Sequence, residues 1–160
     1  MSEASTQAAL PVLAWSRIWS PVVPDELRDD AWIALALPGA YAARSAEFWG
    51  TFQVGNPLPK VPLALHAALR REGGAVREDW LRVAQLLALE WNEVTLPPDQ
   101  LGAACEIYAV AVEREEPVLI EELRRRYLLP WCEFAKARLA SDAPQLAFLP
   151  ERFERDLLAL

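Results

Sequence analysis

The amino-acid sequence predicts an all-α fold, a single-domain helical bundle formed by residues 1–160. Several segments carry apolar residues at intervals of three and four, as Leu101, Ala104, Cys105 and Tyr108 do, and this spacing predicts a helix with one buried face. No segment shows the alternation of apolar and polar residues that is typical of a strand. A chain of 160 residues can bury one core without disulfides or metal, so we expect one domain.

Prolines and glycines separate the helices expected in the N-terminal half. Residues 1–8 are expected to be frayed, and Pro11 suits the first turn of the helix that follows. Asp25 is placed to cap the next helix, which Pro38 and Gly39 close. A loop is expected at residues 55–59, where prolines remove amide donors. The helices expected in this half cover residues 10–19, 25–37, 40–52 and 63–71.

The C-terminal half is also expected to be helical. Pro117 can occupy the first turn of a helix, and Pro130 must break or kink that helix because proline lacks an amide donor. Residues 141–144 are expected to form a loop before a terminal helix. The helices expected in this half cover residues 76–91, 101–112, 117–139 with the break at Pro130, and 151–160.

Composition and charge restrict the classes of partner. The formal net charge of −7 disfavours nucleic acid and suits a basic partner. The longest strongly apolar stretch, residues 32–37, is too short to cross a bilayer, so no membrane span is expected. No signal peptide is visible in the first residues, and two cysteines suit a reducing compartment, so we expect a cytoplasmic protein. The seven tryptophans could all lie in the core, or some could line a groove.

Side chains that could carry catalysis are few. His66 is the only histidine and has no cysteine or carboxylate at a spacing typical of metal ligands, so a structural or surface role is expected. Cys105 and Cys132 lie far apart in sequence and are expected to be buried, inert thiols. No phosphate-binding loop is present. We therefore expect no catalytic residues, no metal and no cofactor, and not an enzyme.

An acidic cluster, Asp25, Glu26, Asp29 and Asp30, opens the second expected helix. Acids in a first helical turn interact favourably with the helix dipole, and this structural role is the preferred interpretation. Such carboxylates could instead hold magnesium in an all-helical enzyme. The alternatives to the function proposed below are therefore a metal-dependent enzyme using residues 25–30, or a general helical adaptor.

The segment Leu96–Tyr108 is the most informative part of the sequence. Two prolines precede Asp99, and an amphipathic helix follows from Leu101. Asp99 is placed to accept hydrogen bonds from the free amides of the first helical turn. Taken alone, the segment predicts a capped helix with one buried face.

Three blocks of the sequence resemble, in the same order, blocks of the TorD/DmsD/NarJ family of redox-enzyme maturation chaperones. They are the aromatic stretch Glu47–Pro59, the group Pro98, Asp99, Leu101 and Glu106, and the segment Arg126–Trp131. The chain departs from the family pattern where Gln100 replaces a common histidine and Ala104 a frequent acidic residue. Unlike histidine, Gln100 cannot become cationic near neutral pH.

The resemblance implies a cytoplasmic, all-helical chaperone that performs no covalent chemistry. Its partner would be the immature catalytic subunit of a molybdenum oxidoreductase, often bound through the twin-arginine signal peptide, and the molybdopterin cofactor would belong to that subunit. The resemblance also indicates which residues would contact this client, although core packing is the ordinary role of the aromatic ones. The candidate client-binding residues are Asp99, Gln100, Glu106, Phe48, Trp49 and Phe52.

Overall fold

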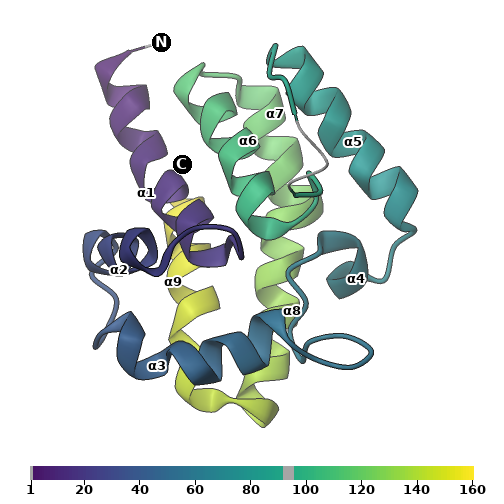
Figure 1. Ribbon diagram of the computed structural model, residues 1–160. Coiled ribbons are helices and arrows are strands. Elements are labelled where there is room, and N and C mark those ends of the chain that lie inside the picture. The colour runs from purple at the N-terminus through teal and green to yellow at the C-terminus, as the bar shows by residue number, and fades with distance from the viewer. Residues whose placement is uncertain (1, 92–95) are drawn as a thin grey trace.

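The computed structural model describes residues 2–91 and 96–160, and within these ranges the chain is helical and contains no strand (Figure 1). The prediction of an all-α helical bundle is therefore confirmed. Two π-helical turns, η1 and η2, and a 3-10 turn, η3, interrupt the α-helices. The elements are α1 (Glu3–Trp19), α2 (Asp25–Ala34), α3 (Tyr41–Phe48), η1 (Trp49–Gln53), α4 (Leu65–Leu69), α5 (Gly73–Leu86), α6 (Leu101–Glu113), α7 (Pro117–Leu123), η2 (Arg124–Leu128), α8 (Leu129–Asp142), η3 (Pro144–Leu146) and α9 (Phe148–Leu158).

Helix α1 packs along α6 and also contacts α2 and α9 (Figure 1). Trp19, at its C-terminal end, lies among aromatic rings from elements that are distant in sequence. Its ring centroid lies 5.1 Å from that of Trp131, 5.3 Å from that of Phe52 and 5.8 Å from that of Phe153. All four rings are buried, so this aromatic cluster fixes where α1 ends.

The N-terminal end of α1 corrects the expectation that residues 1–8 are frayed. The helix begins at Glu3, since Ser2 Oγ accepts from the amide of Ser5 at 3.1 Å and Ser5 Oγ accepts from the amide of Ser2 at 2.9 Å. Ser5 also donates to the Glu113 carbonyl of α6 at 3.0 Å, which holds this turn on the bundle. Pro11 lies inside the helix, and Met1 lies outside the described residues.

Several other helix ends differ from the sequence-based expectation. Helix α5 ends at Leu86 and not at residue 91, α8 continues through Asp142 into the expected loop, and α9 begins at Phe148. Asp25 does not cap α2; it is the first helical residue, and its carboxylate pairs with Arg28 at 2.8 Å. Helix α5 begins at Gly73, because the carboxylate of Glu72 accepts from the amides of Gly74 at 2.8 Å and Ala75 at 2.7 Å. These two backbone hydrogen bonds lower the pKa of Glu72.

The chain segments that lead into α4 and α6 lie side by side. The amide of Leu65 donates to the carbonyl of Asp99 at 2.9 Å, and the amide of Leu101 donates to the carbonyl of Leu63 at 2.8 Å. This short antiparallel contact places the start of α4 against the start of α6. No helix among the described residues is long and apolar enough to span a membrane.

Candidate functional site

Gln100, not Asp99, caps helix α6. Its side-chain oxygen accepts from the amides of Gly102 at 2.7 Å and Ala103 at 3.2 Å. The prediction that the Asp99 carboxylate performs this role was wrong by one residue. Both residues carry a suitable acceptor, and a partner elsewhere in the chain engages the aspartate instead.

That partner is His66 of α4. Its Nδ1 lies 2.6 Å from Asp99 Oδ2, and its backbone amide also donates to Asp99 Oδ2 at 3.3 Å. The Asp99 side chain is fully buried, whereas His66 keeps 30% of its side chain exposed. The structural role expected for His66 is thus a bond that joins α4 to the segment before α6. Asp99, a candidate client-binding residue, has no exposed surface with which to contact a partner.

Side chains from two elements hold the C-terminal end of α1. The carbonyl of Trp19 accepts from the Gln100 amide group at 2.8 Å and from the Gln53 amide group at 3.2 Å. Gly102 is required where α1 and α6 meet, because a Cβ atom there would lie 2.8 Å from the backbone nitrogen of Ser20. Gln100 therefore caps one helix through its oxygen and binds the end of another through its nitrogen.

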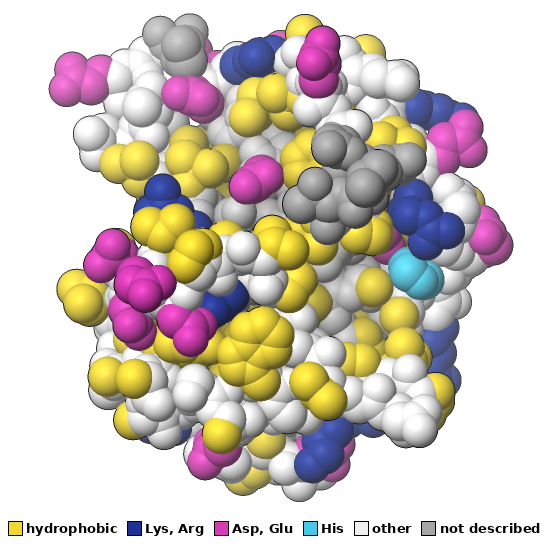
Figure 2. Space-filling model, in the orientation of Figure 1, with side chains coloured by type: hydrophobic (Ala, Val, Ile, Leu, Met, Phe, Trp, Pro, Cys, Tyr) yellow, Lys and Arg dark blue, Asp and Glu magenta, His cyan; other side chains and the backbone are white. Residues whose placement is uncertain are grey.

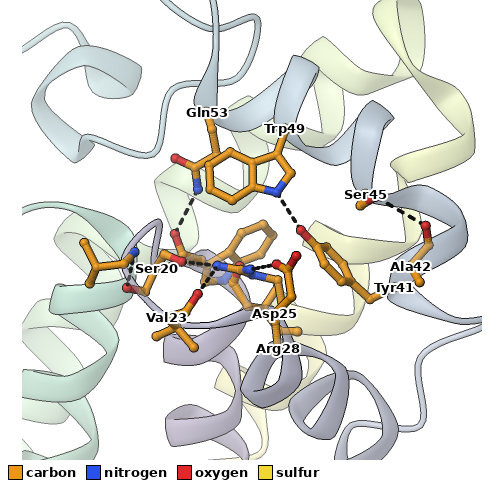
Figure 3. Close-up of polar contacts among 12 residues, drawn as sticks. Ser20, Val23, Asp25, Arg28, Tyr41, Ala42, Ser45, Trp49 and Gln53 are labelled. Atoms are coloured by element: carbon orange, nitrogen blue, oxygen red, sulfur yellow. Dashed lines mark hydrogen bonds and ion pairs between the residues drawn. The ribbon is translucent and has the colours of Figure 1, made fainter.

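Arg28 of α2 holds the loop that follows α1 (Figure 3). Its buried guanidinium donates to the carbonyls of Ser20 and, at 3.3 Å, Val23, while Nε donates to the carbonyl of Ile18 at 3.4 Å. The guanidinium also lies over the rings of Tyr41 and Trp49, with centroid distances of 5.3 and 5.4 Å. Arg28 was not selected from the sequence, because all its partners except Asp25 belong to other elements and most of them are backbone carbonyls.

A hollow of about 250 Å³ opens where this loop, the first turn of α6 and the segment around Trp91 meet. We call it the acidic groove, because Glu90 and Glu106 are the charged residues that line it within residues 2–91 and 96–160. Desolvation raises the pKa of the Glu106 carboxyl, although the residue is exposed. The residues lining the acidic groove are Ser20, Val22, Val23, Glu90, Trp91, Leu96, Gly102, Ala103 and Glu106.

The structure separates the six candidate residues. Glu106 lines the acidic groove, and Gln100 and Asp99 lie behind it in the cap and the α4 contact. Phe48 and Phe52 are buried in the core, so neither has exposed surface with which to contact a client.

Two tryptophans near the site are partly exposed. The indole nitrogen of Trp49 donates to the Tyr41 hydroxyl at 2.7 Å. Trp91 lines the groove; it lies beyond the end of α5 at Leu86, although a helix was expected over residues 76–91.

The other candidate groups are the two cysteines and the acids of α2. Cys105 and Cys132 are both buried free thiols, and burial raises the pKa of each. Among the described residues, no three His, Cys, Asp or Glu side chains are arranged to hold a metal ion. In the acidic cluster of α2, Asp25 is paired with Arg28.

Comparison of the chain with protein-family models, with curated proteins and with solved structures finds no match. The site is therefore interpreted from its own geometry. An apolar hollow bordered by two carboxylates can bind a chain segment that carries a cationic side chain beside apolar ones.

Proposed function

We propose that this chain is a cytoplasmic, client-specific chaperone for the immature catalytic subunit of a molybdenum oxidoreductase. In this function a basic and apolar segment of the client, such as its twin-arginine signal peptide, binds in the acidic groove. The chaperone holds the subunit until the molybdopterin cofactor has been inserted. The cofactor belongs to the client, and the chaperone makes and breaks no covalent bond.

The observation that carries this proposal is the composition of the acidic groove. Val22, Val23 and Leu96 give it apolar surface, and Trp91 adds a partly exposed aromatic ring. Glu106 lies in the same hollow, where partial desolvation strengthens its attraction to a cation. Apolar side chains of a client segment would be covered there, while an arginine of that segment would pair with the carboxylate.

The acids of α2 add negative charge next to this groove. Val22 and Val23 are separated only by Pro24 from the cluster Asp25, Glu26, Asp29 and Asp30. Figure 2 shows acidic side chains gathered over α2 at the left of the molecule, beside apolar side chains that continue across this face. A basic segment would be attracted to this face from a distance, and salt would weaken the attraction.

The remaining candidate residues would act by positioning the groove. Gln100 and Arg28 hold the α1 end and the loop that forms one wall. Asp99 holds the segment before α6 through His66. Of the candidates inferred from the resemblance, Glu106 is thus the one we place in direct contact with the client.

A co-expression experiment tests this function. The chain would be produced with a molybdopterin oxidoreductase subunit from the same genome, and the complex and its molybdenum content would be measured. We expect the two proteins to co-purify, and we expect the subunit to lack molybdenum when the chaperone is absent. The Glu106→Gln variant should weaken the complex, while Glu47→Gln, which removes an exposed acid of α3 outside the groove, should not.

Normal molybdenum loading without the chaperone would contradict the proposal. Equal weakening by the two glutamate variants would contradict the placement of the client in the acidic groove. Magnesium-dependent turnover of a substrate, abolished by Asp29→Asn, would replace the chaperone with the helical enzyme considered from the sequence.

A further inference from the structure

A second groove lies along α8, on the side of the molecule where α4 and the loop before it approach that helix (right side of Figure 1). It consists of two hollows of about 400 and 350 Å³. Both are lined by Arg70, Phe134 and Arg138, so they adjoin. The loop residues Pro57, Leu58, Pro59, Lys60 and Pro62 form the outer wall of one hollow.

The charge of this second groove is opposite to that of the acidic groove. Lys60, Arg70 and Arg138 line it, and none of the described acidic residues does. None of these three cations forms an ion pair with a carboxylate in the part of the chain that the structure describes. The nearby acid Glu133 of α8 is paired with Lys136 at 2.8 Å. Three uncompensated cations therefore share one groove in a chain of net charge −7.

Apolar surface accompanies these cations. The Arg138 guanidinium lies 5.4 Å from the centroid of the Phe134 ring, and Leu58 is 54% exposed. Prolines at positions 57, 59 and 62 restrict the backbone of the outer wall, so little conformational entropy is lost when a ligand contacts it. A simple anion would use only the cations, whereas a peptide can use the cations and the apolar surface together.

We propose that this surface, the basic groove, binds an acidic peptide segment of a protein partner, with acidic residues placed around an apolar side chain. The carboxylates contact Lys60, Arg70 and Arg138, and the apolar side chain lies against Phe134 and Leu58. The acidic and basic grooves share no lining residue. This inference is therefore independent of the client proposed for the acidic groove.

Arg70 allows a particularly clean test, because it ends α4 with a φ of 54°. This left-handed conformation suits glycine, so Arg70→Gly removes the cation without straining the backbone. If Arg70 served only the fold, its removal would lower stability. If it serves binding, Arg70→Gly should fold as well as the parent and bind the peptide less tightly.

The probe is a short fluorescein-labelled peptide in which leucines alternate with pairs of glutamates, titrated by fluorescence anisotropy into the full chain at low salt. We expect Arg70→Gly and Arg138→Gln each to weaken binding about two- to fivefold, and the double variant by roughly tenfold. Arg17→Gln, which removes an exposed cation of α1 outside the groove, should leave the affinity unchanged. Glu106→Gln should also leave it unchanged, which separates this test from that of the acidic groove.

Three results would overturn the basic groove as a peptide site. The first is an affinity for the acidic peptide that the arginine variants do not change, or no binding at all. The second is equal binding of a peptide with serine in place of leucine, together with full competition by sodium tripolyphosphate, which would indicate a simple anion site. The third is preferential binding of a single-stranded oligonucleotide.

Discussion

The acidic and basic grooves are both partly apolar hollows, but they are built and charged in opposite ways. A polar network around Arg28 and Gln100 holds the wall of the acidic groove, and each of these side chains binds backbone groups of α1 or the loop after it. The wall of the basic groove is a proline-rich loop that needs no comparable network. The two surfaces should therefore respond differently to mutation: the acidic groove depends on buried hydrogen bonds, and the basic groove on exposed charges.

The net charge of −7 conceals this difference. It favours a basic partner, which is the kind of client we propose for the face that carries Glu106 and the α2 acids. It gives no indication that Lys60, Arg70 and Arg138 meet on another side, because they are separated by 10 and 68 positions. Net charge describes long-range attraction, and the fold decides where each sign is concentrated.

The largest effect is expected from Arg28→Met, which would break the acidic groove and spare the basic one. Removing the guanidinium leaves the carbonyls of Ile18 and Ser20 without their buried donor, so unfolding should become easier by about 3 kcal/mol. Urea denaturation measures this loss. Arg17→Met is the matched control and should cost less than about 0.5 kcal/mol, as is usual at an exposed position. A loss of similar size in both variants would contradict the account of Arg28.

The next largest effect on stability is expected from Asp99 and His66. Their hydrogen bond joins α4 to the segment before α6. Asp99→Ala should lower the free energy of unfolding by about 2 kcal/mol, because it removes a buried, charge-assisted hydrogen bond. With His66→Ala, the two variants form a double-mutant cycle, and we expect the double variant to cost about 1 kcal/mol less than the sum. Strictly additive losses would show that the two side chains do not stabilise the fold as a pair.

A smaller effect is expected from Gln100→Ala, which removes the α6 cap and one donor to the Trp19 carbonyl. The cost should be about 1 kcal/mol, as for other N-cap residues. Affinity for a basic and apolar peptide should fall as well, because the α1 end forms part of the acidic groove. The acidic peptide provides the control, since its affinity should not change. A change at both grooves would mean that the cap supports the whole bundle rather than one wall.

The smallest effect on stability is expected from Glu106→Gln. Unlike the variants above, it should not lower the free energy of unfolding near neutral pH. Desolvation raises the pKa of this carboxyl in the folded state, so ionisation of Glu106 costs stability as the pH rises through that pKa. Glutamine removes the cost, and the variant should be at least as stable as the parent near neutral pH. Thermal unfolding at neutral and acidic pH measures this difference, which should shrink as the pH falls below the raised pKa and disappear below the ordinary pKa of a glutamate in the unfolded chain.

The same variant should lose affinity for a basic and apolar peptide, although its stability is not reduced. Glu106→Gln should weaken the basic peptide about two- to fivefold, as expected for one partly exposed ion pair. In the parent, affinity should fall as acidification protonates Glu106, starting at a higher pH than for an ordinary glutamate. A parent affinity that does not depend on pH in this range would contradict a direct contact between Glu106 and the peptide.

The comparison of Asp99 with Gln100 shows what sequence alone could predict. The proline loop and the apolar spacing predicted helix α6 with its start at Leu101, because these signals are local. The choice between two adjacent capping side chains depended on His66, which lies 33 residues away. Ser2 gave a similar result, since its capping hydrogen bonds and the contact of Ser5 with α6 order a terminus that composition alone had suggested was frayed.

The aromatic candidates show the same limit for the site. The spacing of Phe48, Trp49 and Phe52 in the sequence predicts that the three rings lie near one another. Which ring is buried depends on the residues that pack against each of them. Phe48 and Phe52 pack on Trp19, whereas Trp49 lies on the Arg28 side and stays partly exposed. Glu106 became a candidate through the family resemblance, and the fold then placed it, exposed on α6, in the lining of the acidic groove. The basic groove could not, since it joins three segments that no local pattern connects.

The most direct test of the proposed function is an NMR titration of the ¹⁵N-labelled chain with the twin-arginine signal peptide of a molybdopterin oxidoreductase subunit from the same genome. We predict shifts at the amides of Val22, Gly102, Ala103 and Glu106, with the amides around Arg70 and Arg138 unchanged. A Kd fitted from these shifts that rises about two- to fivefold in Glu106→Gln, but not in Glu47→Gln, would complete the assignment. Shifts confined to the basic groove, or none at saturating peptide, would contradict the acidic groove as the client site.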